Sequence, residues 1–324
     1  MRSTCSWRLS RAAISLGHRT VIMGILNVTP DSFSDGGLYS NRESAIARAK
    51  EIEQEGAGII DIGGESTRPG SEAISEQEEM RRVLPIIESV VRTVTIPISI
   101  DTYRAGVARR AVEAGAQIVN DISGFRFDDG MPLVVKESSA GVVLMHSRGN
   151  RETLHRQSRM EDPIQEVTDG LSESLRRARA ASIPTGAVVL DPGIGFGKTA
   201  DESLRVLKDL IVFGKLGLPL LVGTSRKSFI HSAGHERSES KPDAKRKRDS
   251  AQPQERAQPS IDERSESKRD SGQPSTRFAS TESNDAGTAA TIVAAIMNGA
   301  HIVRVHNVRQ ARALADMTDR ILLA

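Results

Sequence analysis

The sequence is poor in cysteine and contains no long apolar run. Its single cysteine, Cys5, excludes an internal disulfide framework and fits a reducing compartment, so we expect a cytoplasmic protein. Its apolar runs are far shorter than the roughly 20 residues that a membrane-spanning helix needs. We therefore expect no membrane partner.

The sequence also lacks an excess of charge of either sign. Its 44 Lys and Arg residues are nearly balanced by 42 Asp and Glu, which leaves a formal net charge of +2. A nucleic-acid partner is not expected, because binding a polyanion requires a strong positive field. Hydrophobic residues make up 38% of the 324 residues, enough for the core of one large α/β domain or two smaller ones.

One segment, residues 232–283, almost lacks large apolar side chains. Its only aliphatic residue larger than alanine is Ile261, and its only aromatic residue is Phe278. Such a segment cannot bury enough apolar surface to offset the entropy lost on ordering, so we predict that it is disordered. Its KRKR run, residues 245–248, is similar to a nucleic-acid patch, but the balanced charge of the segment argues against that interpretation.

Elsewhere, short β-branched runs alternate with helical patterns. The runs occupy residues 21–26, 58–62, 97–100, 117–119, 141–145, 187–190, 219–222 and 301–305. Eight such runs, each followed by a helical or excursion segment, predict a single-domain α/β fold, a (β/α)8 TIM barrel over residues 21–324. Segment 232–283 would then be an insertion in the seventh βα excursion. An open doubly wound sheet is the alternative fold.

The first twenty residues support two interpretations. Arg2 and Arg8, with further arginines, several serines and no acidic residue, are typical of a mitochondrial transit peptide. The alternation of Trp7 with Leu9, repeated by Ile14 and Leu16, instead predicts a strand pair leading into the barrel. We favour the strand pair, because a cleavable peptide would leave the first barrel strand almost without a lead-in.

Polar residues stand where the predicted strands end. In a (β/α)8 barrel these positions face one mouth, where the βα loops build the active site. Any one of them could instead cap the next helix, but capping accounts poorly for the whole set. The long polar loop from Asn27 to Gly37 would extend this site, although alone it could equally be a surface loop. The strand-end residues are Asn27, Asp61, Asp101, Asn120, Asp121, His146, Asp191, Ser225, Arg226, Lys227, Arg304 and His306.

The signs of these side chains predict a ligand with two different ends. Cations at the last two strands suit a phosphate or diphosphate, and an amide oxygen after the first strand could share a Mg2+ that bridges the phosphate oxygens. Acceptors on the opposite strands suit a planar heterocycle with N–H donors. The cations are Lys227, Arg304 and His306, the amide is that of Asn27, and the acceptors are Asp101, Asn120 and Asp191.

The GKT run at residues 197–199 is similar to the end of a phosphate-binding P-loop. Pro192 occupies the position of the first glycine that such a loop requires, so we reject a nucleotide-triphosphatase function. Gly193, Gly195 and Gly197 would instead let the backbone approach a ligand closely.

Seven motifs together resemble the dihydropteroate synthase family of pterin-binding enzymes. They are MGILNVTPDSFSDGG from Met23, DIGGESTRPG from Asp61, SIDTYRAGVARRAVEAGAQIVNDISG from Ser99, LMH from Leu144, DPGIGFGK from Asp191, GTSRKSFI from Gly223 and RVHNV from Arg304. The resemblance implies a transferase of tetrahydrofolate biosynthesis. It would join 6-hydroxymethyl-7,8-dihydropterin diphosphate to 4-aminobenzoate and release 7,8-dihydropteroate and diphosphate.

The resemblance also implies roles for the residues at matching positions. It suggests a Mg2+ ligand beside the diphosphate, Asn27, and contacts to the pterin edge from Asp101, Asn120, Asp191 and Lys227. It implies pocket walls at Met145 and Phe196, a guanidinium stacked on the ring at Arg304, and His306 beside Arg304 on the diphosphate. It implies an aminobenzoate rim of Thr67, Arg68, Pro69 and Ser225, over which Phe33 would close. Gly223 completes the expected substrate-binding set, and the expected catalytic residues are Asp101, Asp191, Lys227 and Arg304.

The sequence leaves two alternative functions open and also predicts an oligomeric state. A pterin-binding methyltransferase is one alternative function, although it should lack the STRPG and SRK features, and a non-catalytic pterin-binding paralogue is another. Asn307 departs from the family pattern, which usually has an aspartate after the histidine. Apolar positions in the last helices, among them Val308, Leu314, Ile321 and Leu322, predict a homodimer face.

Overall fold

The computed structural model describes residues 2–29, 38–67, 70–154, 157–223, 225 and 276–324. The expected site residues Phe33, Arg68, Pro69 and Lys227 lie outside the described residues. Most of segment 232–283 also lies outside them, and the next described element, helix α8, begins at Thr276.

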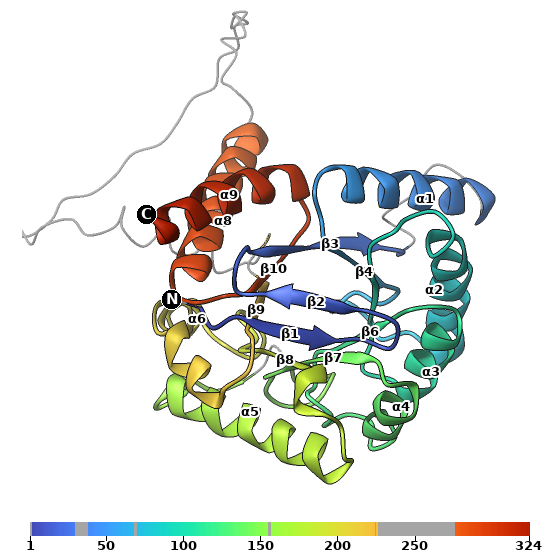
Figure 1. Cartoon of the computed structure of the whole chain (residues 1–324), viewed down its shortest axis with the longest axis horizontal. Coiled ribbons are helices and arrows are strands. Elements are labelled where there is room, and N and C mark those ends of the chain that lie inside the picture. The colour runs from blue at the N-terminus through green and yellow to red at the C-terminus, as the bar shows by residue number, and fades with distance from the viewer. Residues whose placement is uncertain (1, 30–37, 68–69, 155–156, 224, 226–275) are drawn as a thin grey trace, which may run out of the picture.

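Eight parallel strands form a barrel that is enclosed by helices (Figure 1). Hydrogen bonds join the strands in the order β8-β7-β6-β5-β4-β3-β10-β9, and a bridge between Leu190 and Leu220 brings β8 against β9. The predicted (β/α)8 barrel is confirmed. The open doubly wound sheet is wrong, because it would leave β8 and β9 as separate edges. The strands are β3 (Val21–Asn27), β4 (Ile59–Gly63), β5 (Ile98–Asp101), β6 (Ile118–Asp121), β7 (Gly141–Met145), β8 (Val188–Asp191), β9 (Leu221–Gly223) and β10 (Ile302–Val305).

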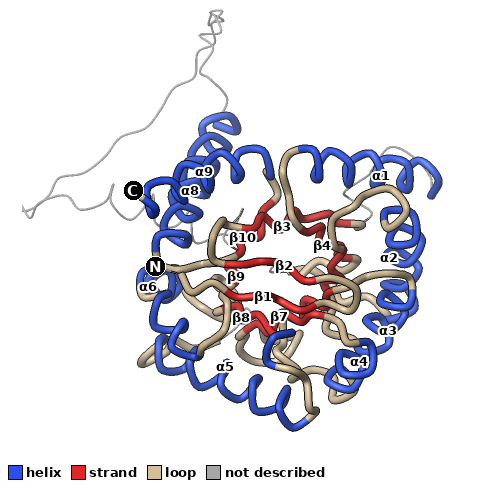
Figure 2. Tube along the Cα trace, in the orientation of Figure 1, coloured by secondary structure: helices blue, strands red, loops and turns tan. Residues whose placement is uncertain are grey.

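The helices form a ring outside the strands (Figure 2). Side-chain caps set their first turns: Ser75 Oγ accepts from the Glu78 N–H at the start of α2, and Thr199 and Glu202 cap α6 reciprocally. Among the described helices, none has the length and apolar character needed to cross a membrane. The helices are α1 (Leu38–Gln54), α2 (Glu76–Val90), α3 (Ala105–Glu113), α4 (Met131–Ser138), α5 (Pro163–Ala180), α6 (Ala200–Lys208), α8 (Thr276–Met297) and α9 (Val308–Leu323), with 3-10 turns η2 (Thr185–Ala187) and η3 (Leu210–Leu216).

The interior of the barrel changes from apolar to polar along the strands. Its apolar layer lies near the strand starts and consists of Met23, Ile59, Ile118, Val143, Val189, Leu221 and Ile302. Side chains alternate between the two faces of a strand, so the next inward positions lie two residues further on. These positions hold Ile25, Asp61, Asn120, Met145, Asp191, Gly223 and Arg304. The fold therefore places a polar layer directly above a packed apolar floor.

An N-terminal hairpin crosses the end of the barrel where the strands begin (Figure 1). Strands β1 (Cys5–Arg8) and β2 (Ala13–Leu16) pair antiparallel. Trp7, Leu9 and Leu16 are buried and pack against the apolar interior layer. The indole Nε1 of Trp7 also donates to the carbonyl of Ala187 at 2.9 Å. The hairpin thus covers the end opposite to the polar layer.

Helix α9 buries one of the positions that we expected at a dimer face. Val308 is fully buried, and a Cβ at Gly24 of β3 would lie only 2.9 Å from its side chain. Its assignment to a dimer face is therefore wrong, because this side chain packs on the barrel. Ile321 is 58% exposed, and its neighbours Met317 and Leu323 are also exposed.

Candidate active site

Polar side chains gather at the carboxyl ends of the strands. Asn27, Asp101 and Asp191 are the last residues of β3, β5 and β8, and Asn120 is the second-last residue of β6. Asn120 and Asp191 are buried, at 4% and 5% exposure. These residues share one end because all eight strands run parallel. This end of the barrel is the candidate active site.

Arg304 lies at the centre of this group. Its Nε donates to Oδ2 of Asp61 at 2.6 Å, and its terminal nitrogen pairs with Oδ2 of Asp101. Asn120 donates to the same oxygen of Asp61 at 3.1 Å. Asp61 therefore holds the guanidinium of Arg304 and the amide of Asn120, which come from different strands.

Asp61 was absent from the predicted set of substrate contacts, and the structure places it in the polar layer beside Arg304 and Asn120. Its side chain is fully buried, and its Oδ1 has no hydrogen-bond partner among the described residues. An unsatisfied buried acceptor is costly, so this oxygen favours a ligand that brings an N–H or O–H donor. The sequence indicated that Asp61 points into the barrel. Asp61 lies on a predicted strand two residues after Ile59, so the two side chains point to the same face.

The contacts of Arg304 correct the predicted division of the mouth into a cationic and an acceptor side. Arg304 lies against the carboxylates of Asp61 and Asp101 rather than apart from them. Burial acts to lower the pKa of Arg304, but these two carboxylates more than offset that effect and raise it. Arg304 is thus a permanent cation that bridges the acceptors.

The protonation of Asp101 depends on its burial. Burial raises the pKa of Asp101 well above the usual value of an aspartate, although Arg304 acts in the opposite direction. The nearby carboxylate of Asp61 raises this pKa further. Asp101 is consequently closer to titration at neutral pH than an ordinary surface aspartate is.

We expect the affinity for a flat heterocycle that donates N–H groups to increase about several-fold between pH 6 and pH 8. Rising pH deprotonates Asp101, and only the carboxylate offers both oxygens as acceptors to ring donors. Isothermal titration calorimetry across this range measures the effect. Asp101→Asn is the control, because it retains any titration of the ligand but loses that of the protein. An equal pH dependence in both proteins would contradict the assignment.

Apolar side chains line the mouth next to these polar groups. Met145, Ile122 and Leu154 form a buried cluster, and Tyr103 and Phe196 pack against it. The structure thus brings together Met145 and Phe196, the two predicted pocket walls, although they are far apart in the sequence. Such a wall suits the face of a flat ring.

Three of the other predicted residues lie at the ends of the last two strands, where Arg304 is also placed. Ser225 Oγ is 3.1 Å from Nδ1 of His306, and a Cβ at Gly223 would contact the side chain of Arg304. Thr67 follows β4 on the loop at the same end of the barrel. The last two strands therefore deliver Gly223, Ser225, Arg304 and His306 to one place.

The side-chain oxygen of Asn27 suits a Mg2+ ion that is also bound by the phosphates of a substrate. Its Oδ1 and the Asp101 carboxylate lie on either side of Gly63, where a Cβ would be 3.8 and 3.7 Å from these oxygens. Among the described residues, no group of three or more His, Cys, Asp or Glu side chains could hold a metal ion. A single amide oxygen still suits Mg2+, which commonly takes its other ligands from phosphates and water.

Two strand-end residues do not face the mouth, and their assignment to it is wrong. His146 follows Met145, which points inward, so alternation directs His146 toward α5, where a Cβ at Gly170 would lie 2.4 Å from its ring. Burial lowers the pKa of His146 to about 2, with a further contribution from Lys198, so it is neutral. Asp121 likewise accepts from the backbone N–H groups of Ser123 and Phe125 and caps its own loop.

The glycine-rich loop after β8 is held by protein contacts. Lys198 of the GKT run donates to the carbonyl of Gly193 at 2.9 Å and lies 2.9 Å from Nδ1 of His146. Gly193 has φ +67°, and a Cβ there would collide with the His146 carbonyl at 1.9 Å. Lys198 thus serves the protein's own backbone, which agrees with rejecting the nucleotide-triphosphatase function.

Asn307 acts as the N-cap of α9. Its side-chain oxygen accepts from the backbone N–H of Gln310 at 3.1 Å. Asparagine and aspartate are similarly good N-caps, so this departure from the family pattern preserves the helix start.

Comparison with known proteins identifies what this barrel is similar to. The family model described as pterin binding enzyme matches residues 23–255. Dihydropteroate synthase of Bacillus subtilis is 42% identical over 311 residues, which cover 96% of this chain and 92% of the relative. Dihydropteroate synthase of Escherichia coli is 36% identical over 317 residues, with 96% and 95% covered.

Solved structures agree with these relatives. Xanthomonas albilineans dihydropteroate synthase with 4-aminobenzoic acid superimposes with a TM-score of 0.79 at 31% identity and covers 99% of this chain and 100% of that chain. The same enzyme in complex with 7,8-dihydropteroate gives a TM-score of 0.73 at 31% identity, with 96% and 97% covered.

Proposed function

Since the chain belongs to the pterin-binding enzyme family, among its dihydropteroate synthases, we propose that it joins 6-hydroxymethyl-7,8-dihydropterin diphosphate to 4-aminobenzoate. The products are 7,8-dihydropteroate and diphosphate. The single observation that carries this proposal is the polar layer in which Arg304 bridges Asp61 and Asp101 beside Asn120. It offers a buried set of acceptors and a cation to one flat, donor-rich ring.

The reaction needs no nucleophilic side chain. The amine nitrogen of aminobenzoate forms a bond to the exocyclic methylene carbon of the pterin, the bond from that carbon to the diphosphate oxygen breaks, and the amine loses a proton. Positive charge that develops on the pterin as diphosphate leaves is stabilised by the carboxylates of Asp101 and Asp191. Arg304 and His306, with Lys227, would take up the negative charge of the leaving group.

The last strand supports a diphosphate position beside Arg304. His306 follows β10 and offers its imidazole there, and its Nδ1 lies 3.1 Å from Oγ of Ser225, which belongs to the aminobenzoate rim. A bound Mg2+ held by Asn27 would neutralise charge on the departing diphosphate. Removal of divalent cations with a chelator, followed by re-addition of Mg2+, tests this part of the proposal.

Diphosphate release in the presence and absence of 4-aminobenzoate tests the function. We expect release that depends on aminobenzoate and is accompanied by an equal amount of dihydropteroate. A non-catalytic paralogue would bind the pterin and release nothing. A methyltransferase would instead transfer a methyl group from methyltetrahydrofolate to a corrinoid.

We also propose a cytoplasmic homodimer. The single Cys5 supports a reducing compartment. Met317 and Ile321, which lie one turn apart on α9, are exposed apolar side chains that suit a partner copy. A monomer mass in sedimentation equilibrium at micromolar concentration would contradict the dimer.

A further inference from the structure

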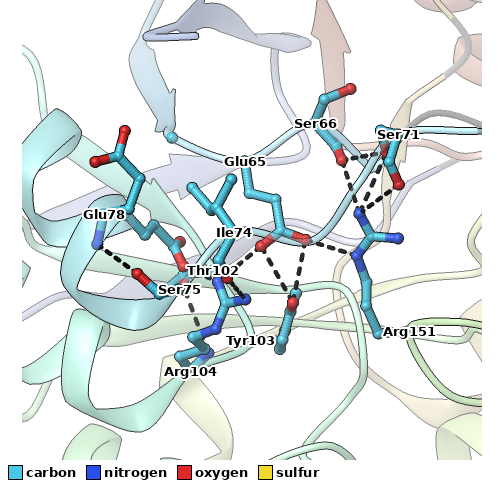
Figure 3. A network of polar contacts seen from close by, with 12 residues as sticks. Glu65, Ser66, Ser71, Ile74, Ser75, Glu78, Thr102, Tyr103, Arg104 and Arg151 are labelled. Carbon is cyan, nitrogen blue, oxygen red and sulfur yellow. Dashed lines mark hydrogen bonds and ion pairs between the residues drawn. The ribbon is translucent and has the colours of Figure 1, made fainter.

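Two glutamates and two arginines pack together beside the mouth, where the loop after β4 meets the loops after β5 and β7 (Figure 3). The side chains of Glu65 and Glu79 are 4% and 1% exposed, and those of Arg104 and Arg151 are each 15% exposed. Arg104 pairs with both glutamates, and Arg151 pairs with Glu65 at 2.6 Å. Two buried negative charges are thus matched by two positive charges, as buried ion pairs require.

Tyr103 completes the anchoring of Glu65. Its hydroxyl donates to both carboxylate oxygens of Glu65, at 3.1 and 3.2 Å. Burial raises the pKa of Tyr103 to about 12, and the charge of Glu65 contributes to this shift, so the hydroxyl stays protonated and remains a donor. Glu65 is therefore held by groups from two different loops and provides a fixed point for Arg151.

Arg151 uses one terminal nitrogen on the loop after β4. Its Nη2 donates to the carbonyl of Ser66 at 3.0 Å and to Oγ of Ser71 at 3.2 Å. The Ser71 hydroxyl in turn donates to the Ser66 carbonyl at 2.5 Å. Figure 3 shows the guanidinium reaching from Glu65 to both serines. Arg151 thus joins Ser66 and Ser71, which lie before and after Thr67 in this loop.

Charge balance alone does not account for these contacts. A lysine at position 151 would neutralise Glu65 equally well, but its single ammonium cannot serve Glu65 and the two serines in the fixed fork of a guanidinium. The bonds to Ser66 and Ser71 act on the loop backbone and not on the barrel. Their effect is to fix Ser66 and Ser71 at the rim of the mouth.

We propose that Arg151 is a positioning residue for 4-aminobenzoate. It holds Ser66 and Ser71 in the loop after β4 and thereby sets the position of the adjacent Thr67, without touching either substrate. This inference rests on the proposed function, in which Thr67 belongs to the aminobenzoate rim. The polar groups assigned to the pterin lie on the strands β4, β5, β6, β8 and β10 themselves and not on this loop.

Steady-state kinetics of Arg151→Lys tests the inference, with Arg109→Lys as the matched control. Arg109 pairs with Glu137 at 2.8 Å on the outer surface and is 46% exposed. For Arg151→Lys we expect the KM for aminobenzoate to rise about 10- to 100-fold, because small misplacements of positioning groups have effects of this size. The KM for the pterin diphosphate and the melting temperature should stay near those of the wild type. Arg109→Lys should change none of these quantities.

Ser71→Ala is the second variant, because it leaves every ion pair of the cluster intact. It removes the hydroxyl that Arg151 and Ser66 share, so the KM for aminobenzoate should again rise while the KM for the pterin diphosphate does not. Unchanged aminobenzoate KM in both folded variants would overturn the inference, and so would an equal rise in both KM values. If the wild type shows no aminobenzoate-dependent release of diphosphate, the proposed function itself fails; normal turnover in the wild type and both variants refutes the inference alone.

Discussion

Replacing Arg304 with alanine is expected to lower kcat/KM by about 10²- to 10³-fold, the loss that removal of one preorganised donor commonly causes. The guanidinium contacts Asp61 and Asp101 and is only 21% exposed. Its removal leaves two carboxylates close together in a buried layer without their cation. We expect Asp101, whose pKa is already raised by burial, to take up a proton, which removes an acceptor for the ring.

Two further variants separate the charge of Arg304 from its geometry. Arg304→Lys keeps the charge but not the fork that reaches both carboxylates, so its kcat/KM should fall between those of the wild type and Arg304→Ala. Arg309→Ala is the control on α9, where the side chain is 83% exposed, and it should leave kcat/KM unchanged. Wild-type kcat/KM in a folded Arg304→Ala variant would contradict the central place given to this residue.

Trp7→Ala should lower the free energy of unfolding by about 3 to 5 kcal/mol, the range for truncation of a large buried aromatic side chain. Trp7 is 1% exposed and packs against the apolar layer at the strand starts. The change opens a cavity between the hairpin and the barrel floor and leaves the Ala187 carbonyl without the indole donor. Urea denaturation followed by circular dichroism measures the loss.

Trp7→Phe distinguishes packing from hydrogen bonding. It keeps most of the ring but loses the bond to Ala187, so we expect a smaller loss of about 1 to 2 kcal/mol. The KM for either substrate should not change in the folded Trp7→Ala variant, since the hairpin covers the end of the barrel opposite to the mouth. Equal unfolding free energies for Trp7→Ala and the wild type would show that the hairpin adds nothing to the core.

The barrel could be predicted from the sequence because its signals are local. Each strand is a short β-branched run, and the polar residue at its end is visible without any knowledge of the partners. The errors at Asp121 and His146 have a physical cause in the same pattern. Each follows an inward residue, Asn120 or Met145, so the two-residue alternation of a strand turns it away from the mouth.

Contacts between residues far apart in the chain could not be predicted from the sequence. Arg304 and Asp61 are 243 positions apart, and Arg151 and Glu65 are 86 apart. Barrel closure and strand register bring such pairs together, and neither is encoded in a local run. The sign pattern therefore predicted two separate sides of the mouth, whereas the closed barrel places Arg304 between two aspartates.

A crystal structure with a bound pterin analogue would test the account most directly. We expect the donor edge of the ring within hydrogen-bond distance of Asp101, Asn120 and Asp191, with the guanidinium of Arg304 facing the ring. A different result is possible, because the protein has another cavity in which a ligand could bind. It lies beside α5 and is lined by His146, Arg148 and Gly170 among others. A pterin bound there, with the strand ends empty, would contradict the assignment of the mouth as the active site.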